Sequence, residues 1–210
     1  MKIKTPLFDI KIDILFIIVM FIFFLSDKIR VFLTSFFVCY LFIVFHEASH
    51  MLAASILGKS IDTFNISVFG VNITFKENHY SLTVKNKQYL KEILVYIAGP
   101  ISNFLLAILF YKVKLVFDIN VFLCFLNLIP IYPLDGYNVL ENLLYFFKFK
   151  QARVSHIIKV INYCLFLILF VIGLIVLLII YNPSLILFLL YLILIKNVNV
   201  NCINKPKYYS

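Results

Sequence analysis

The residues best suited to chemistry are His46, Glu47 and His50, which form an HExxH pattern inside an apolar run at about residues 31–57. Histidines four residues apart lie one above the other on one face of a helix, so both imidazoles can bind one tetrahedral Zn²⁺. The intervening glutamate can then act as a general base on a water molecule at the metal. Ionisable residues inside a membrane segment are costly and usually functional. The spacing and the setting therefore predict a hydrolytic zinc site.

A catalytic zinc site needs a third protein ligand, and Asp135 is the candidate. It lies in the segment NLIPIYPLDG, residues 127–136, where Pro130 and Pro133 cannot continue a regular helix. Irregular backbone at membrane depth is tolerated only where protein or a cavity surrounds it. Taken alone, Asp-Gly after Pro-Leu would indicate a tight turn. Beside an HExxH that lacks a third ligand, a metal-binding role is favoured.

The composition places the chain among integral membrane proteins. Of its 210 residues 63% are hydrophobic, and the mean hydropathy is +1.03, far outside the range of soluble domains. The predicted fold class is an all-α polytopic membrane protein with six transmembrane helices and a small membrane-associated β-hairpin or sheet between spans 2 and 3. Residues 1–196 form the intramembrane core and residues 197–210 a short polar cytoplasmic tail. The spans are expected at about residues 12–25, 31–57, 89–111, 114–129, 157–181 and 184–195.

The segment between the second and third spans is predicted to be β-structure. Gly58 stops the preceding helix. Residues 63–68 and 71–75 alternate polar and apolar on either side of Phe69 and Gly70, which is a hairpin signal, and residues 80–84 could add a third strand. Such a sheet could present an edge to an extended substrate. An ordinary interfacial hairpin is the alternative.

The third span contains Gly99 and Pro100, followed by Asn103. Proline breaks or kinks a membrane helix, and a small residue beside it permits close approach of another helix. One interpretation is a packing kink. The other is that Asn103 hydrogen-bonds to a neighbouring helix.

The charges provide a check on topology that does not use these motifs. Six spans put both termini on one side, and most of the 19 Lys and Arg residues fall on that side. The positive-inside rule then makes both termini cytoplasmic, as in a bacterial cell membrane. The second and fourth spans both run inward, so Gly58 and Asp135 are expected near the same face. Because the charges lie between apolar spans, they report topology, and no nucleic-acid partner is expected.

Together, the HExxH, the Ala98-Gly99-Pro100 segment with Asn103, and the segment at residues 127–136 resemble the site-2 protease family of intramembrane zinc metalloproteases. The resemblance covers the six-span core. It implies that His46, His50 and Asp135 bind Zn²⁺ and that Glu47 activates water. It also implies that Asn127 helps to hold the substrate or the tetrahedral intermediate.

Within the family, the small size and cytoplasmic termini resemble the branch of stage IV sporulation protein FB, without the CBS domain usual there. That branch removes the pro-sequence of a sporulation sigma factor of the pro-sigma-K type. The partners implied are a membrane-associated or membrane-spanning protein substrate (a pro-sigma factor or an anti-sigma factor), membrane regulatory proteins and the lipid bilayer. A signal-peptide remnant is another substrate left open.

Two readings outside the enzyme class remain. A zinc transporter or sensor would need carboxylates or histidines on several spans to make a path, and beyond the proposed site the spans carry few. A catalytically silent membrane scaffold would not need Glu47 between the two histidines. An intramembrane zinc metalloendopeptidase is therefore the function that the sequence favours.

Overall fold

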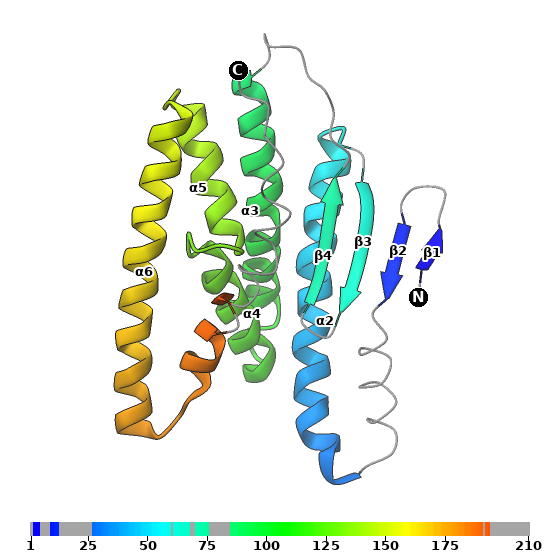
Figure 1. Cartoon of the computed structure of the whole chain (residues 1–210). Coiled ribbons are helices and arrows are strands. Elements are labelled where there is room, and N and C mark those ends of the chain that lie inside the picture. Colours follow the sequence, from blue (N-terminus) through cyan, green and yellow to red (C-terminus); the bar gives the residue numbers. More distant parts are fainter. Residues whose placement is uncertain are drawn as a thin grey trace. The chain divides into compact units, whose positions relative to one another are not determined.

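The structure, a computed structural model, describes residues 2–4, 9–12, 27–59, 61–67, 70–75, 85–190 and 192–193 (Figure 1). The chain divides into two compact units, Met1–Leu126 and Asn127–Ser210, each described here by itself. Most of the predicted first span, the predicted strand at residues 80–84, the end of the sixth span and the polar tail lie outside the described residues.

Helix α2 (Asp27–Ile56) carries the HExxH and ends where the sequence predicts. Gly58 has a φ of 77°, a left-handed conformation that glycine adopts at little cost. Its N–H donates to the Ser55 carbonyl at 3.0 Å, and the Lys59 N–H donates to the Ala54 carbonyl at 2.8 Å. These two bonds form a Schellman motif, which satisfies the last carbonyl groups of the helix. The predicted stop at Gly58 is confirmed.

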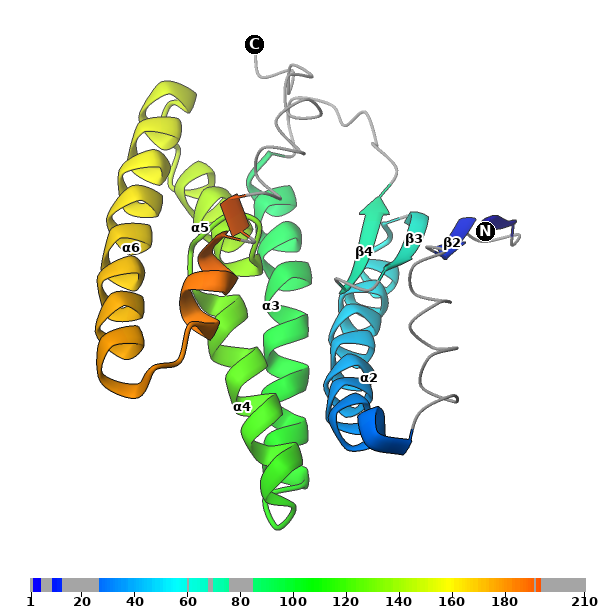
Figure 2. The ribbon, with the colours of Figure 1, turned by 60° about the horizontal axis from the view of Figure 1, so that its bottom comes forward.

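Four strands form one sheet in the order β1-β2-β3-β4. Strands β1 and β2 pair antiparallel, β2 and β3 pair parallel, and β3 and β4 pair antiparallel. Both β3 and β4 contact α2, and Figures 1 and 2 show them lying along that helix. The strands span Lys2–Lys4, Asp9–Ile12, Ile61–Ser67 and Gly70–Phe75, in that order.

The strands β3 and β4 fall on residues where the sequence alternates between polar and apolar. The sequence also predicted that this hairpin associates with the membrane. That association, and a role for its edge in holding substrate, stay predictions. The parallel pairing of β2 with β3 was not predicted. It joins segments that lie on either side of α2 in the sequence, so no local pattern reports it.

Helix α3 (Lys85–Leu109) packs against α2 within the first unit. Two polar contacts join its first half to the C-terminal end of α2. Lys59 forms a salt bridge with Glu92, and the Lys91 ammonium donates to the Leu57 carbonyl at 2.8 Å. Lys91 therefore supplies a donor and a positive charge to the end of α2, where the helix dipole favours cations.

Pro100 lies inside α3 and does not end it, because the helix continues for more than two further turns. Proline lacks the N–H that would bond to the carbonyl four residues earlier, so the ladder of α3 is interrupted at this point. Helix α4 (Lys114–Leu128) follows after a short turn. Its buried Asn120 donates to the Val116 carbonyl of the same helix at 2.9 Å.

The second unit is built around helices α5 (Asp135–Phe146) and α6 (Gln151–Ile180), which pack together. Residues 184–190 are also helical. A buried hydrophobic cluster of the second unit consists of Ile131, Leu189 and Leu192. Partly buried apolar side chains pack around that cluster: Ile129, Leu134, Leu165, Phe166, Leu169 and Phe188.

Three helices among the described residues are long and apolar enough to cross a membrane: Phe37–Ile56, Asn86–Leu109 and Gln151–Ile180. They correspond to the predicted second, third and fifth spans. Helix α4 has 15 residues, fewer than the roughly 20 that a span requires. The six-span count therefore stays a prediction.

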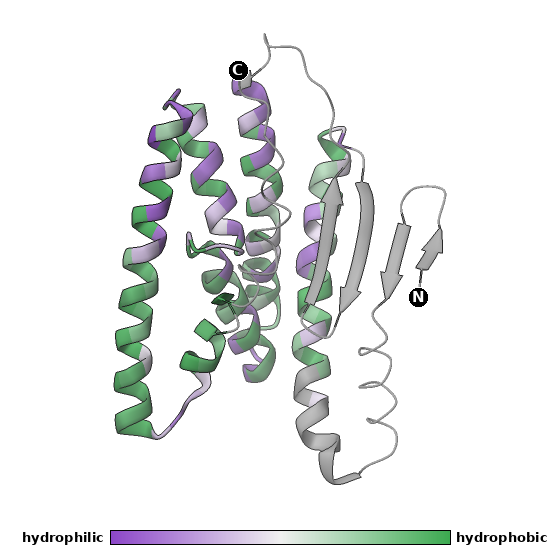
Figure 3. Cartoon of the chain, viewed as in Figure 1, coloured by the Kyte–Doolittle hydropathy of each residue, from purple (hydrophilic) through white to green (hydrophobic). Residues whose placement is uncertain are grey.

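The surface of α6 has the character of a lipid-facing helix. Figure 3 shows that the residues along its C-terminal part are almost all hydrophobic. Leu178 and Ile179 are 73% and 71% exposed, and large exposed apolar surfaces are rare on soluble monomers. The apolar helices indicate an integral membrane protein.

Candidate metal centre

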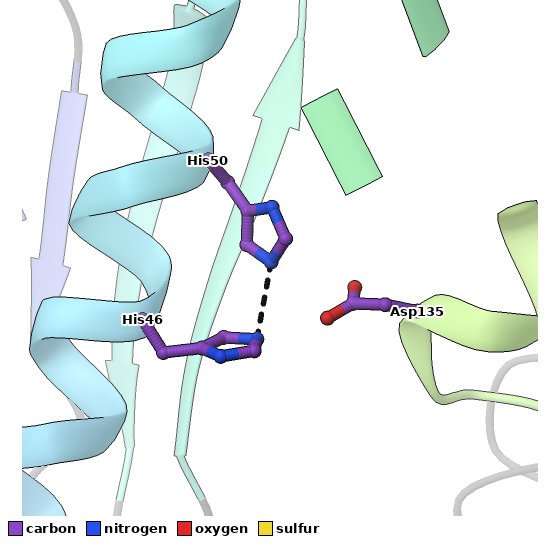
Figure 4. Close-up of side chains that lie close together, drawn as sticks. All are labelled: His46, His50 and Asp135. Carbon is purple, nitrogen blue, oxygen red and sulfur yellow. Dashed lines mark hydrogen bonds between the residues drawn. The ribbon is translucent and has the colours of Figure 1, made fainter. Parts of the chain in front are cut away.

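The two histidines of the HExxH lie on one face of α2 with their rings close together (Figure 4). His46 and His50 are only 4% and 5% exposed. Their Nε2 atoms face each other at 3.1 Å, and the ring planes are 83° apart. The i, i+4 spacing thus aims two ligand nitrogens at one point, as the sequence predicts.

The separation of these nitrogens fits a zinc ion. Zn–N bonds in proteins are about 2.0–2.1 Å long. Two nitrogens 3.1 Å apart that both make such bonds subtend an angle of about 100° at the metal. That angle is close to the tetrahedral value, so the pair can bind Zn²⁺ with little rearrangement.

His50 is oriented by the backbone of α3. Its Nδ1 lies 2.7 Å from the Val95 carbonyl oxygen. A carbonyl can only accept, so Nδ1 must carry the proton, and in the neutral ring the lone pair is left on Nε2. A second partner of this kind fixes both the tautomer and the orientation of a metal-binding histidine.

His46 is held by a side chain of α3. One end of the Asn103 amide, assigned as Nδ2, lies 3.0 Å from His46 Nδ1. Asn103 is completely buried, and its Oδ1 has no hydrogen-bond partner. The interpretation that Asn103 bonds to a neighbouring helix is confirmed, because it joins α3 to α2.

Gly99 allows α3 to approach the two rings. A Cβ atom at this position would lie 2.6 Å from both Cε1 and Nε2 of His46, and even closer to Nε2 of His50. No side chain can occupy that space, so only glycine permits the observed approach. The sequence predicted close approach of another helix at this small residue, but not that the two histidine rings would lie against it. The close fit supports a built metal site rather than a chance HExxH.

The other predicted site residues lie on three helices. Glu47 is half-buried on α2, between the histidines, and Asn127 is half-buried near the end of α4. Asp135 is half-buried and begins α5, rather than sitting in an isolated tight turn. The N-terminus of a helix favours a carboxylate, because the helix dipole is positive there. A Cβ on the next residue, Gly136, would collide with the backbone of Leu128, so glycine permits this close packing.

Tyr137 adds no charge to the start of α5 at physiological pH. Burial raises the pKa of its phenol to about 12, and the charge of Glu141 acts in the same direction. Its ring packs edge-to-face against Tyr132, with 5.4 Å between the ring centroids. The phenol therefore stays protonated beside Asp135.

Part of this chain is similar to a known protein family. Residues 34–118 match the model of Peptidase family M50. The matched segment contains both histidines, Glu47, Gly99 and Asn103, and ends before Asn127 and Asp135. A search of curated proteins finds no match.

A solved structure shares the fold. The chain resembles the site-2 protease from Methanocaldococcus jannaschii with a TM-score of 0.59 and 23% sequence identity, over 91% of this chain and 91% of that one. At this identity the likeness concerns the fold. The family match and the apolar helices agree with an integral membrane protein.

Proposed function

We propose that this protein is an intramembrane zinc metalloendopeptidase of the site-2 protease type. One observation carries the proposal: a buried histidine pair inside a candidate membrane span, with Nε2 atoms 3.1 Å apart. The match of the surrounding residues to Peptidase family M50 supports it. A peptide bond in or at the membrane is then the bond that is cleaved.

We propose His46, His50 and Asp135 as the zinc ligands. In support, each side chain carries an atom of a kind that binds zinc: a ring nitrogen in either histidine and a carboxylate oxygen in Asp135. Two imidazoles and a carboxylate form a set typical of catalytic zinc, with a position left for water or substrate. When bound, zinc would act as a Lewis acid toward a carbonyl oxygen and lower the pKa of water.

Glu47 is the proposed general base and acid. Its carboxylate takes a proton from the attacking water as the water oxygen adds to the scissile carbonyl carbon. It then delivers that proton to the amine nitrogen as the C–N bond breaks. Asn127 is the proposed substrate-holding residue, because a side-chain amide can donate to the carbonyl oxygen where negative charge develops.

The substrate proposed is a membrane-associated or membrane-spanning protein. A pro-sigma factor of the pro-sigma-K type remains the first choice, on the sequence resemblance, with a membrane-spanning anti-sigma factor as the alternative. We also propose that the chain crosses the membrane six times with both termini in the cytoplasm. A zinc transporter is disfavoured, since it would need carboxylates or histidines on several spans, and beyond the proposed site the predicted spans carry few.

Glu47→Gln tests the reaction without removing a proposed metal ligand. The wild type, the Glu47→Gln variant and Ser49→Ala are reconstituted in liposomes with a tagged pro-sigma-K-type protein or a membrane-spanning anti-sigma factor. Ser49 is the matched control, because its hydroxyl donates only to the Phe45 carbonyl of its own helix, at 2.8 Å. Cleavage products and zinc content are measured together.

We expect Glu47→Gln to lower the cleavage rate by about 10²–10⁴-fold, the usual contribution of general acid–base catalysis, with zinc content unchanged. Ser49→Ala should retain both cleavage and zinc. Wild-type cleavage rates in Glu47→Gln would overturn the proposed reaction. Failure of the wild type to cleave either substrate would overturn the substrate proposal.

A further inference from the structure

We infer that Asn103 is a positioning residue that sets the tautomer of His46, by accepting a hydrogen bond from His46 Nδ1–H through its Oδ1. The inference rests on the proposed function, because the tautomer matters only if His46 binds a metal through Nε2. Three observations lead to it: the burial of Asn103, its contact with His46, and its unpartnered oxygen.

The unpartnered oxygen is the first step. Burying a polar atom without a partner is costly, so such an atom requires an explanation. The oxygen and nitrogen ends of an amide have nearly the same size and shape, and the surrounding hydrogen bonds decide which is which. Turning the Asn103 amide by 180° places Oδ1 at the position 3.0 Å from His46 Nδ1.

The two orientations impose different tautomers on His46. If Nδ2 donates, Nδ1 must hold a lone pair, so the proton is on Nε2 and that nitrogen cannot bind a metal. If Oδ1 accepts, Nδ1 must carry the proton and Nε2 holds the lone pair. Only the second orientation makes His46 a ligand through the nitrogen that faces His50.

The histidine pair decides between these orientations when a cation is bound. His50 Nε2 already holds a lone pair, because its Nδ1 donates to the Val95 carbonyl. With Oδ1 accepting, two lone pairs face each other at 3.1 Å, an arrangement that repels unless a cation binds both. Zinc and the turned amide therefore stabilise each other.

The helix α3 thus positions both proposed ligands with one stripe of residues. Val95, Gly99 and Asn103 are spaced four apart and lie on one face of the helix. The first orients His50 and the last orients His46, while the glycine between them gives room for both rings. Such outer partners fix ligand orientation, and losing one typically costs 10–100-fold in metal affinity.

Two substitutions with opposite hydrogen-bonding properties test the inference. Asn103→Leu keeps the approximate shape without a polar atom, and Asn103→Asp supplies acceptors only. Asn120→Leu is the matched control, since Asn120 is equally buried, also has an unpartnered Oδ1, and donates to its own helix. Zinc affinity is measured by chelator competition, and the His46 tautomer by ¹⁵N chemical shifts of the ring nitrogens in zinc-loaded protein.

We expect Asn103→Leu to weaken zinc binding about 10–100-fold, and Asn103→Asp and Asn120→Leu to stay within about threefold of wild type. In the wild type, His46 Nδ1 should show the shift of a protonated nitrogen. Equal affinity in Asn103→Leu, or an equal loss in Asn103→Asp, would overturn the inference, because the residue would then be neutral or merely structural.

The same experiment separates the inference from the proposed function. Thermal unfolding of each variant without zinc confirms that the fold persists. If the zinc affinities follow the expected order but the wild type cleaves neither substrate, the tautomer role stands and the proposed substrates fail. If the wild type binds no zinc, both fail.

Discussion

The close approach of α3 to the histidines predicts a large effect from one methyl group, in Gly99→Ala. An alanine Cβ would lie 2.6 Å from His46 Nε2, whereas ordinary contacts between such atoms are about 3.5 Å. The rings or the helix must therefore move by about 1 Å. A shift of that size would lengthen the 2.7 Å bond from His50 to the Val95 carbonyl beyond hydrogen-bonding distance.

The expected loss follows from the partners that this movement removes. Losing one outer partner of a metal-binding histidine costs about 10–100-fold in affinity, and Gly99→Ala disturbs the partners of both. We expect zinc affinity to fall on the order of 10²-fold or more. Overpacking should also destabilise the fold by about 1–3 kcal/mol, partly offset by about 1 kcal/mol from the higher helix propensity of alanine.

The assay is zinc competition with a chelator, with thermal unfolding measured on the same preparations. Gly173→Ala in α6 is the control, because the nearest atom to its Cβ would be Cγ1 of Ile186, at 3.1 Å. Zinc affinity of Gly173→Ala should equal that of wild type. Wild-type affinity in Gly99→Ala would refute the argument that only glycine permits the approach of α3 to the two histidine rings.

Two further substitutions test the ligand set and the helix stop. Asp135→Asn should weaken zinc binding at least tenfold in the same competition assay. Asp118→Asn is the control, because it changes an exposed acid on α4, and its zinc affinity should equal that of wild type. Wild-type zinc affinity in Asp135→Asn would remove Asp135 from the ligand set. Gly58→Ala should lower the free energy of unfolding by about 1–2 kcal/mol, because φ at this residue is 77°, with Gly58→Asn losing less since asparagine tolerates that conformation. Denaturant unfolding measures the difference, and an unchanged midpoint in Gly58→Ala would contradict the Schellman assignment.

Several features of the fold follow from local sequence, and the structure agrees with them. The spacing of His46 and His50 fixes a shared helix face, because 3.6 residues per turn brings positions i and i+4 together. Gly58 ends α2 because a left-handed residue there satisfies the last carbonyls. The long apolar runs become α2, α3 and α6, and each has the length and hydropathy that a membrane span requires.

Other features depend on contacts between distant segments. The partner of His50 is a backbone carbonyl 45 residues away, and every residue has such a group, so no residue type marks it. The parallel pairing of β2 with β3 joins strands on either side of α2, beyond the reach of local periodicity. Asp135 begins a helix where an isolated Asp-Gly favours a turn, because the segment that follows forms α5 and packs on α6.

The sequence by itself therefore determined which side chains can do chemistry, because HExxH spacing is a property of one helix. The tertiary structure decided how those side chains are held. Gly99 is informative only once α3 lies against the histidines, and Asn103 only once its amide meets His46 Nδ1. Ligand spacing follows from the 3.6-residue period, whereas ligand orientation depends on packing between helices, which no local pattern encodes.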